Sequence, residues 1–66
     1  MILLRQEREK KGLSQTELAR LSGVKQQSIS MIERGEQKNP GIETLNALAV
    51  ALRCDLRDLY KPETTN

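Results

Sequence analysis

A group of closely spaced side chains in the middle of the chain could bind a polar partner. The group consists of Lys25, Gln26, Gln27, Ser30 and Met31. A glutamine amide carries both a hydrogen-bond donor and an acceptor, a serine hydroxyl does the same, and lysine adds a positive charge. These side chains suit nucleobases and phosphates, whereas a surface for an apolar protein partner would carry a hydrophobic stripe.

The residue types argue against an enzyme and against a metal site. The 66 residues include no histidine and one cysteine, so the common structural zinc sites lack ligands and no disulfide can form within the chain. A domain of this size also has little room to enclose a substrate. We expect no catalytic activity, cofactor or metal, and we interpret Cys54 as a small buried hydrophobic residue rather than a reactive thiol.

The charged residues are unevenly distributed. The net charge is +2, and residues 1–41 hold 8 basic and 5 acidic side chains. A basic excess in this part of the chain is compatible with a nucleic acid as partner, and equally with ordinary solvated helix surfaces. The lone thiol and the lack of a signal-like or membrane-spanning apolar run predict a cytoplasmic protein without membrane contact.

The spacing of apolar residues predicts a chain built from short helices. We expect one domain over residues 1–61 and a flexible tail over 62–66, beginning at Pro62. The expected helices cover residues 2–11, 15–22 and 26–34, followed by a fourth that begins just after Pro40 and a short fifth that Asp55 caps. The fourth helix should be the most buried element, with Ile42, Leu45, Leu48, Ala49 and Leu52 inward, and the fifth should turn Leu56, Leu59 and Tyr60 inward.

Local signals define the ends of the second and third helices. Ser14 and Glu17 have the spacing of a capping box, in which each side chain accepts a hydrogen bond from the other residue's backbone amide. Gly12, Gly23 and Gly35 stand where helices would end in a left-handed residue. The second helix should place Leu18, Ala19 and Leu21 inward.

The second and third helices should form a compact unit around a tight turn. Its expected core is Leu18, Ala19, Gly23, Val24, Ile29 and Ile32. A small residue at Ala19 allows the helices to cross closely, Gly23 permits the sharp turn, and the branched side chains hold the third helix at a steep angle to the second. The outer side of the third helix then projects, and a helix presented in this way can enter the major groove of DNA.

Residues 12–35, followed by a proline loop and the segment TLNALAVAL, resemble the Cro/C1-type (Xre-like) helix-turn-helix family. The matching positions are Gln15, Leu18, Ala19, Gly23, Val24, Ile29, Ser30, Ile32, Glu33, Gly35 and Leu45. The resemblance spans residues 3–60. It implies an all-α, five-helix, lambda-repressor-like DNA-binding domain, as in lambdoid phage repressors, and a repressor-like transcriptional regulator. A protein-interaction module of the antitoxin or anti-repressor kind, built on the same fold, is the alternative.

The resemblance also implies roles for individual residues. Base contacts fall to Lys25, Gln26, Gln27 and Met31, since glutamine can bond adenine, lysine can donate to guanine and methionine can touch a thymine methyl. Phosphate contacts fall to Gln15 with its backbone amide, and by position to Ser28, Arg34, Lys38 and Arg8.

The family usually binds DNA as dimers on two-fold-related half-sites. We therefore expect a homodimer on a double-stranded operator, formed only on DNA or as part of a longer regulator. Its contact would lie around Pro40 and the turn from Arg53 to Arg57. No small-molecule effector is expected.

The resemblance implies one ion pair, and the chain departs from the family pattern at two positions. Family members often join the sites of Arg8 and Glu33 by a partly buried ion pair, and we predict that pair here as the link that holds the third helix. Lys25 stands where Ser or Thr is common and cannot cap a helix, which costs about 1 kcal/mol. Arg53 stands where glycine is frequent, and it should strain the turn after the fourth helix.

Overall fold

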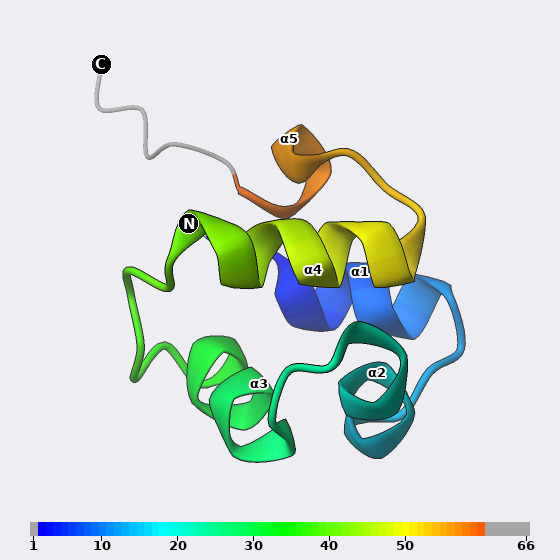
Figure 1. The fold of residues 1–66 in the computed structure, drawn as a ribbon, viewed down its shortest axis with the longest axis horizontal. Helices are drawn as coiled ribbons and strands as arrows, with labels where there is room; N and C mark the ends of the chain where they lie inside the picture. Colours follow the sequence, from blue (N-terminus) through cyan, green and yellow to red (C-terminus); the bar gives the residue numbers. More distant parts are fainter. Residues whose placement is uncertain (1, 61–66) are drawn as a thin grey trace.

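The computed structural model describes residues 2–60 and consists of five helices. They are α1 (Leu4–Lys10), α2 (Gln15–Ser22), α3 (Gln26–Glu33), α4 (Ile42–Leu52) and α5 (Leu56–Leu59) (Figure 1). Within these described residues the only extended pairing is a single antiparallel bridge between Ile2 and Tyr60. The predicted all-α, five-helix fold is confirmed. The predicted tail, Pro62 and the domain boundary at residue 61 lie outside the described residues.

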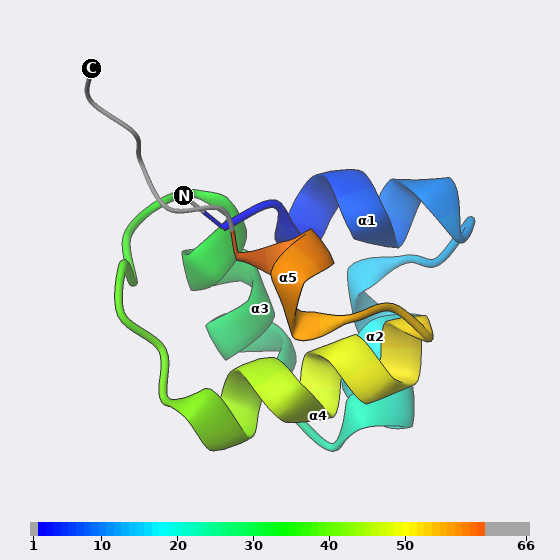
Figure 2. The same cartoon turned by 90° about the horizontal axis from the view of Figure 1, so that it is seen from above.

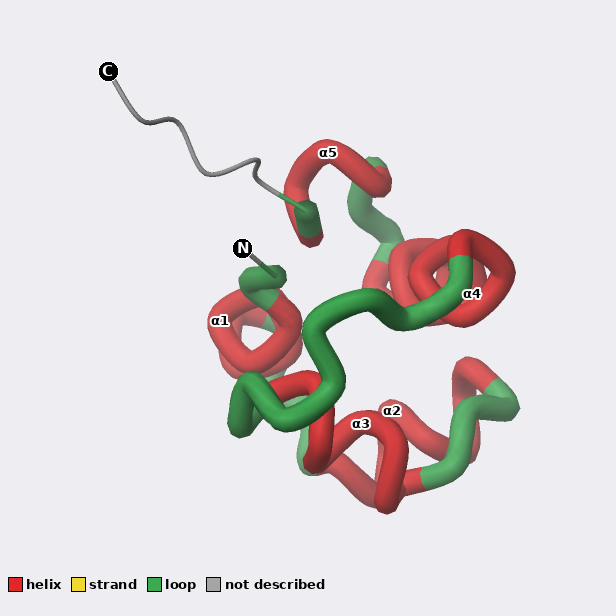
Figure 3. Tube along the Cα trace, turned by 90° about the vertical axis from the view of Figure 1, so that its left-hand side faces the viewer, coloured by secondary structure: helices red, strands yellow, loops and turns green. Residues whose placement is uncertain are grey.

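The helices are arranged in three levels. Helices α1 and α4 form the middle level, and α2 and α3 lie together on one side of it (Figure 1). Helix α5 lies on the opposite side, against both α1 and α4 (Figures 2 and 3). One side of α3 is therefore left without a covering helix within the described residues.

The core is one cluster to which every helix contributes. Its fully buried side chains include Leu4 of α1, Leu18 of α2, Ile29 of α3, Leu48 and Leu52 of α4, and Leu59 of α5. Helix α4 supplies four buried residues, more than any other helix, in agreement with the prediction that it is the most buried element. Burial of one such side chain typically contributes about 1.5–3 kcal/mol.

Three apolar residues predicted to point inward are instead exposed: Leu21 (51%), Ile42 (58%) and Tyr60 (46%). Each lies at the end of a helix, where the neighbouring helices no longer cover it. Leu21 is in the last turn of α2, Ile42 is the first residue of α4, and Tyr60 follows the last residue of α5. Helical periodicity predicts the direction of a side chain, but not how far the neighbouring element extends.

Helix α1 is shorter than predicted because its first residues pair with the other end of the domain. The Leu3 N–H donates to the Leu59 carbonyl at 2.7 Å, and Ile2 bridges Tyr60. These contacts join positions far apart in the sequence, and they hold residues 2 and 3 out of the helix. Helix α3 ends one residue early, with Arg34 as its C-cap.

The predicted helix ends at α2 and α4 are present. The Ser14 hydroxyl accepts from the Glu17 N–H at 3.0 Å, and the Glu17 carboxylate accepts from the Ser14 N–H at 2.9 Å. Asp55 and Asp58 form a second capping box at α5. Arg53 adopts the left-handed conformation, with φ 55° and ψ 44°, which is the strain expected of a residue with a Cβ at this position.

None of the helices in residues 2–60 is long and apolar enough to cross a membrane.

Candidate nucleic-acid interface

The turn between α2 and α3 fixes the direction in which α3 leaves the domain. Gly23 ends α2 with φ 77°, and its N–H donates to the Ala19 carbonyl at 2.9 Å. The next residue is held as well, because the Val24 N–H donates to the Ser22 hydroxyl at 3.1 Å. Val24 packs against the core. The geometry of the predicted helix-turn-helix unit is thus set by the backbone of the turn.

Helix α3 has a buried side and an exposed side. Ile29 and Ile32 are buried in the core, which anchors the helix at its middle and its end. Lys25, Gln26 and Gln27 are exposed, whereas Ser28, Ser30 and Met31 are half-buried. The structure therefore places the three predicted base-contacting residues before and at the start of α3 on one open edge, with Met31 one turn further along.

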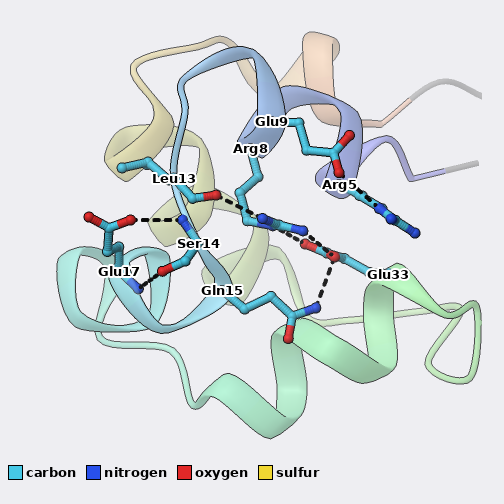
Figure 4. Close-up of polar contacts among 8 residues, drawn as sticks. All are labelled: Arg5, Arg8, Glu9, Leu13, Ser14, Gln15, Glu17 and Glu33. Carbon is cyan, nitrogen blue, oxygen red and sulfur yellow. Dashed lines mark hydrogen bonds and ion pairs between the residues drawn. The ribbon is translucent and has the colours of Figure 1, made fainter.

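Arg8 of α1 and Glu33 of α3 form the expected ion pair. The guanidinium binds the carboxylate in a bidentate manner, with Nε to Oε2 at 2.7 Å and the second contact at 3.0 Å (Figure 4). The side chains are 12% and 4% exposed respectively. Because water is largely excluded, the loss of one partner would leave a buried unpaired charge, which typically costs about 3–5 kcal/mol.

The ion pair is part of a larger hydrogen-bonded group. Arg8 also donates to the Leu13 carbonyl at 2.7 Å, and the Gln15 side-chain amide donates to Glu33 at 3.0 Å (Figure 4). Burial alone would raise the pKa of Glu33, but the hydrogen bonds from Arg8 and Gln15 outweigh it and lower the pKa. The hydrogen bond to Glu33 likewise raises the pKa of Arg8. Both groups are therefore charged at neutral pH.

These contacts bear on two predicted phosphate contacts, which stay predictions. Arg8 is nearly buried and three of its nitrogens already donate within the domain, so its side chain could reach a phosphate only by breaking these bonds. The Gln15 side chain is turned toward Glu33, which leaves its backbone amide, in the first turn of α2, as the group that can meet an anion.

A contact between α2 and α3 was missed by the sequence analysis. The Thr16 hydroxyl donates to Oε1 of Gln26 at 3.2 Å. Thr16 is exposed and lies between Ser14 and Glu17 of the capping box. The sequence offers no signal for this contact, since it depends on how closely the N-termini of the two helices approach.

The remaining predicted phosphate contacts lie after and within α3. Arg34 and Lys38 are exposed and Ser28 is half-buried. Arg34 forms a surface ion pair with Glu36, with Nε to Oε2 at 3.0 Å. Such an exposed pair contributes little to stability, so Arg34 can exchange Glu36 for a phosphate.

The described residues contain no group of three side chains able to hold a metal ion. Cys54 is half-buried and packs against the core, and its burial raises the pKa of the thiol. The polar groups that remain accessible for a partner include the donors, acceptors and cation of Lys25, Gln26 and Gln27 on the exposed edge of α3.

This fold and this edge define a helix-turn-helix protein. The helix-turn-helix family model matches residues 4–59, and the chain belongs to this Cro/C1-type family. One relative is the HTH-type transcriptional regulator SlrR of Bacillus subtilis (strain 168), which is 37% identical over 62 residues. That match covers 94% of this chain and 41% of SlrR. A Haemophilus influenzae relative, 51% identical over 45 residues, is likewise described as an HTH-type transcriptional regulator.

Solved structures show the same arrangement of helices. The restriction-modification controller protein C.AhdI from Aeromonas hydrophila is 40% identical, with a TM-score of 0.81. The match covers 86% of this chain and 85% of C.AhdI. The biofilm regulator SinR, solved in complex with DNA, is 37% identical, with a TM-score of 0.79. The match covers 82% of this chain and 86% of the SinR chain. This chain spans less than half the length of the curated relatives SlrR and a Haemophilus influenzae regulator.

Proposed function

We propose that this chain binds double-stranded DNA in a sequence-specific manner and regulates transcription in the cytoplasm, as a repressor-like protein. The observation that carries the proposal is the exposed edge of Lys25, Gln26 and Gln27 on a helix whose other side is anchored in the core by Ile29 and Ile32. An α-helix fits the major groove, where each base pair presents a distinct pattern of donors and acceptors. This family of structures includes SinR in complex with DNA.

The base-contacting residues are Lys25, Gln26, Gln27 and Met31. Both glutamine amides can pair a donor and an acceptor with adenine, and Lys25 can donate to acceptors of guanine. Lys25 is the N-cap of α3 and makes no side-chain capping bond. Its side chain is therefore free to extend toward the DNA, which compensates for the missing cap at this position.

The phosphate contacts position the protein on the duplex. The Gln15 backbone amide opens the first turn of α2, where the helix dipole also favours an anion. Ser28, Arg34 and Lys38 supply a hydroxyl and two cations from α3 and the loop that follows it. Contacts of this kind hold the protein in register but do not distinguish sequences.

A second copy of the chain supplies the second half of the binding site. The exposed Ile42 and Tyr60 line a surface pocket together with Pro40, Leu45, Leu56 and Arg57. Glu43 on α4 and Arg57 on α5 bring opposite charges to this region, so two copies related by a two-fold axis can pair Glu43 of one with Arg57 of the other. This surface is small, and we propose that the homodimer forms on two-fold-related half-sites.

Selection of bound sequences from a random pool of duplex DNA tests this function. We expect enrichment of one motif with two-fold symmetry, and an affinity that falls steeply between about 50 and 200 mM salt because binding releases counterions. Binding that is absent or insensitive to salt would contradict the proposal and would support a protein-interaction module instead.

A further inference from the structure

The first two residues of α2 contact opposite ends of α3. Gln15 turns toward Glu33, the last residue of α3, whereas Thr16 turns toward Gln26, its first residue. The contact of Gln15 joins a group that is largely buried and supports the fold. The contact of Thr16 is exposed, and a hydrogen bond that competes with water contributes little to stability. A bond of this kind can still limit the positions open to the Gln26 side chain.

The contact holds the end of the Gln26 side chain close to α2. The Thr16 hydroxyl donates to Oε1 of Gln26, so Oε1 is held toward α2 and Nε2 is directed away from it. A glutamine amide can rotate to exchange these two ends, and each orientation presents different groups to a base. The Thr16 hydroxyl would accept from Nε2 if the amide were reversed, so the contact places the end of the side chain, and the structure has the orientation with Nε2 outward.

We infer that Thr16 is a positioning residue for base recognition, which holds Gln26 so that its Nε2 donates to N7 of a purine. This inference rests on the proposed DNA-binding function and deepens it. Purines carry an N7 acceptor in the major groove and pyrimidines do not. Oε1 keeps a second lone pair, so the held amide can also accept from N6 of an adenine. When DNA covers the edge and excludes water, the bond between Thr16 and Gln26 becomes stronger.

The inference is tested by removing the hydroxyl and measuring base preference. Binding constants of the wild type, Thr16→Val, Thr16→Ser, Gln26→Ala and the double variant Thr16→Val/Gln26→Ala are measured on the selected operator and on all its single-base-pair substitutions. Valine has the shape of threonine without the hydroxyl, and serine keeps the hydroxyl. Thr16→Ala is measured in parallel, since alanine is a strong helix former, and thermal unfolding shows that each variant is folded.

We expect Thr16→Val and Thr16→Ala to lose about 2- to 10-fold of the purine preference at one base pair, because the glutamine must then be ordered by the DNA alone. That base pair should be the one at which Gln26→Ala loses its preference. Thr16→Ser should retain the wild-type profile. The double variant should match Gln26→Ala, because Thr16 acts only through Gln26.

Three results would overturn the inference while leaving the proposed function intact. They are a wild-type profile in Thr16→Val, an equal loss of affinity on every sequence, and a loss of preference at a base pair that Gln26 does not affect. An equal loss would instead indicate a direct contact between Thr16 and a phosphate. A wild-type protein without any base preference would overturn the proposed function and this inference together.

Discussion

Adjacent polar side chains on a helix point about 100° apart, so in this protein they contact different partners. Gln15 joins the buried ion pair between α1 and α3, and Thr16, the next residue, joins the exposed edge at Gln26. The same division occurs along α3, where Ile29 enters the core and Gln27 faces solvent. A single substitution can therefore affect DNA recognition without affecting the fold.

Gln26→Ala tests base recognition at the residue scale. Gln26 is exposed, so its truncation should leave the stability unchanged. We expect a loss of about 1–3 kcal/mol on the cognate operator and a relaxed preference at one base pair. Competition binding against single-base-pair substitutions measures both effects. A loss of the same size on every sequence would show that Gln26 contacts no base.

Lys38→Ala tests a contact of the opposite kind. Lys38 is an exposed cation in the loop between α3 and α4, and a phosphate contact there should weaken binding to all sequences alike. The slope of log K against log salt concentration should decrease by about one unit. An unchanged slope would remove Lys38 from the phosphate contacts. The selectivity among operator variants serves as the internal control, since it should not change.

At the scale of elements, the turn after α4 is strained at one residue. Arg53 lies at φ 55°, which costs a residue with a Cβ about 1–2 kcal/mol, while glycine avoids this cost but is more flexible when unfolded. Arg53→Gly should thus add about 0.5–1 kcal/mol of stability and raise Tm by about 2–8 °C in thermal unfolding. Arg53→Ala is the control, because it removes the guanidinium and keeps the Cβ, and it should give no gain.

The link between α1 and α3 should make the stability depend on pH in acid. The pKa of Glu33 in the folded protein is below its ordinary value of 4.5, so the unfolded chain takes up the proton first as the pH falls. The stability that this carboxylate contributes is complete above pH 4.5 and is lost as the pH falls toward the folded pKa. At neutral pH this contribution is fully present.

Glu33→Gln tests this dependence. It is introduced into Arg53→Gly, the parent protein of this comparison, because the added stability expected of that variant offsets part of the cost. The substitution leaves Arg8 buried without a charged partner, which should cost about 3–5 kcal/mol at pH 7. Urea unfolding at several pH values should show a shallower decline of stability below pH 4.5 than in the parent. Equal slopes in the two proteins would mean that other carboxylates carry the acid dependence.

The agreement between sequence and structure follows from the range of the interactions involved. The capping box at Ser14 and the end of α2 at Gly23 depend on a few adjacent residues, and a sequence pattern is sufficient to predict them. The bridge between Ile2 and Tyr60 joins distant positions, and the partner of the Thr16 hydroxyl depends on how two helices approach. The resemblance to a family supplied the Arg8–Glu33 pair, which no local pattern contains.

At the scale of the whole molecule, two exposed apolar residues of α4 allow a test of the proposed homodimer. Ile42 is 58% exposed in the pocket with Tyr60, whereas Val50 is 77% exposed on the same helix and does not line that pocket. These two residues form a matched pair for a test of the homodimer. A two-fold interface contains Ile42 twice, so its effect on assembly is doubled.

Ile42→Gln should weaken binding to an operator with two half-sites by about 10- to 50-fold, because about 1 kcal/mol of apolar burial is lost in each copy. Binding to a single half-site should be unchanged, since Ile42 is not among the proposed DNA contacts. Val50→Gln removes a comparable side chain outside the pocket and should change neither affinity. Mobility shifts on one and two half-sites, with sedimentation of the complexes, measure both quantities. If Val50→Gln weakens the two-site complex and Ile42→Gln does not, the two copies meet across the outer side of α4 instead.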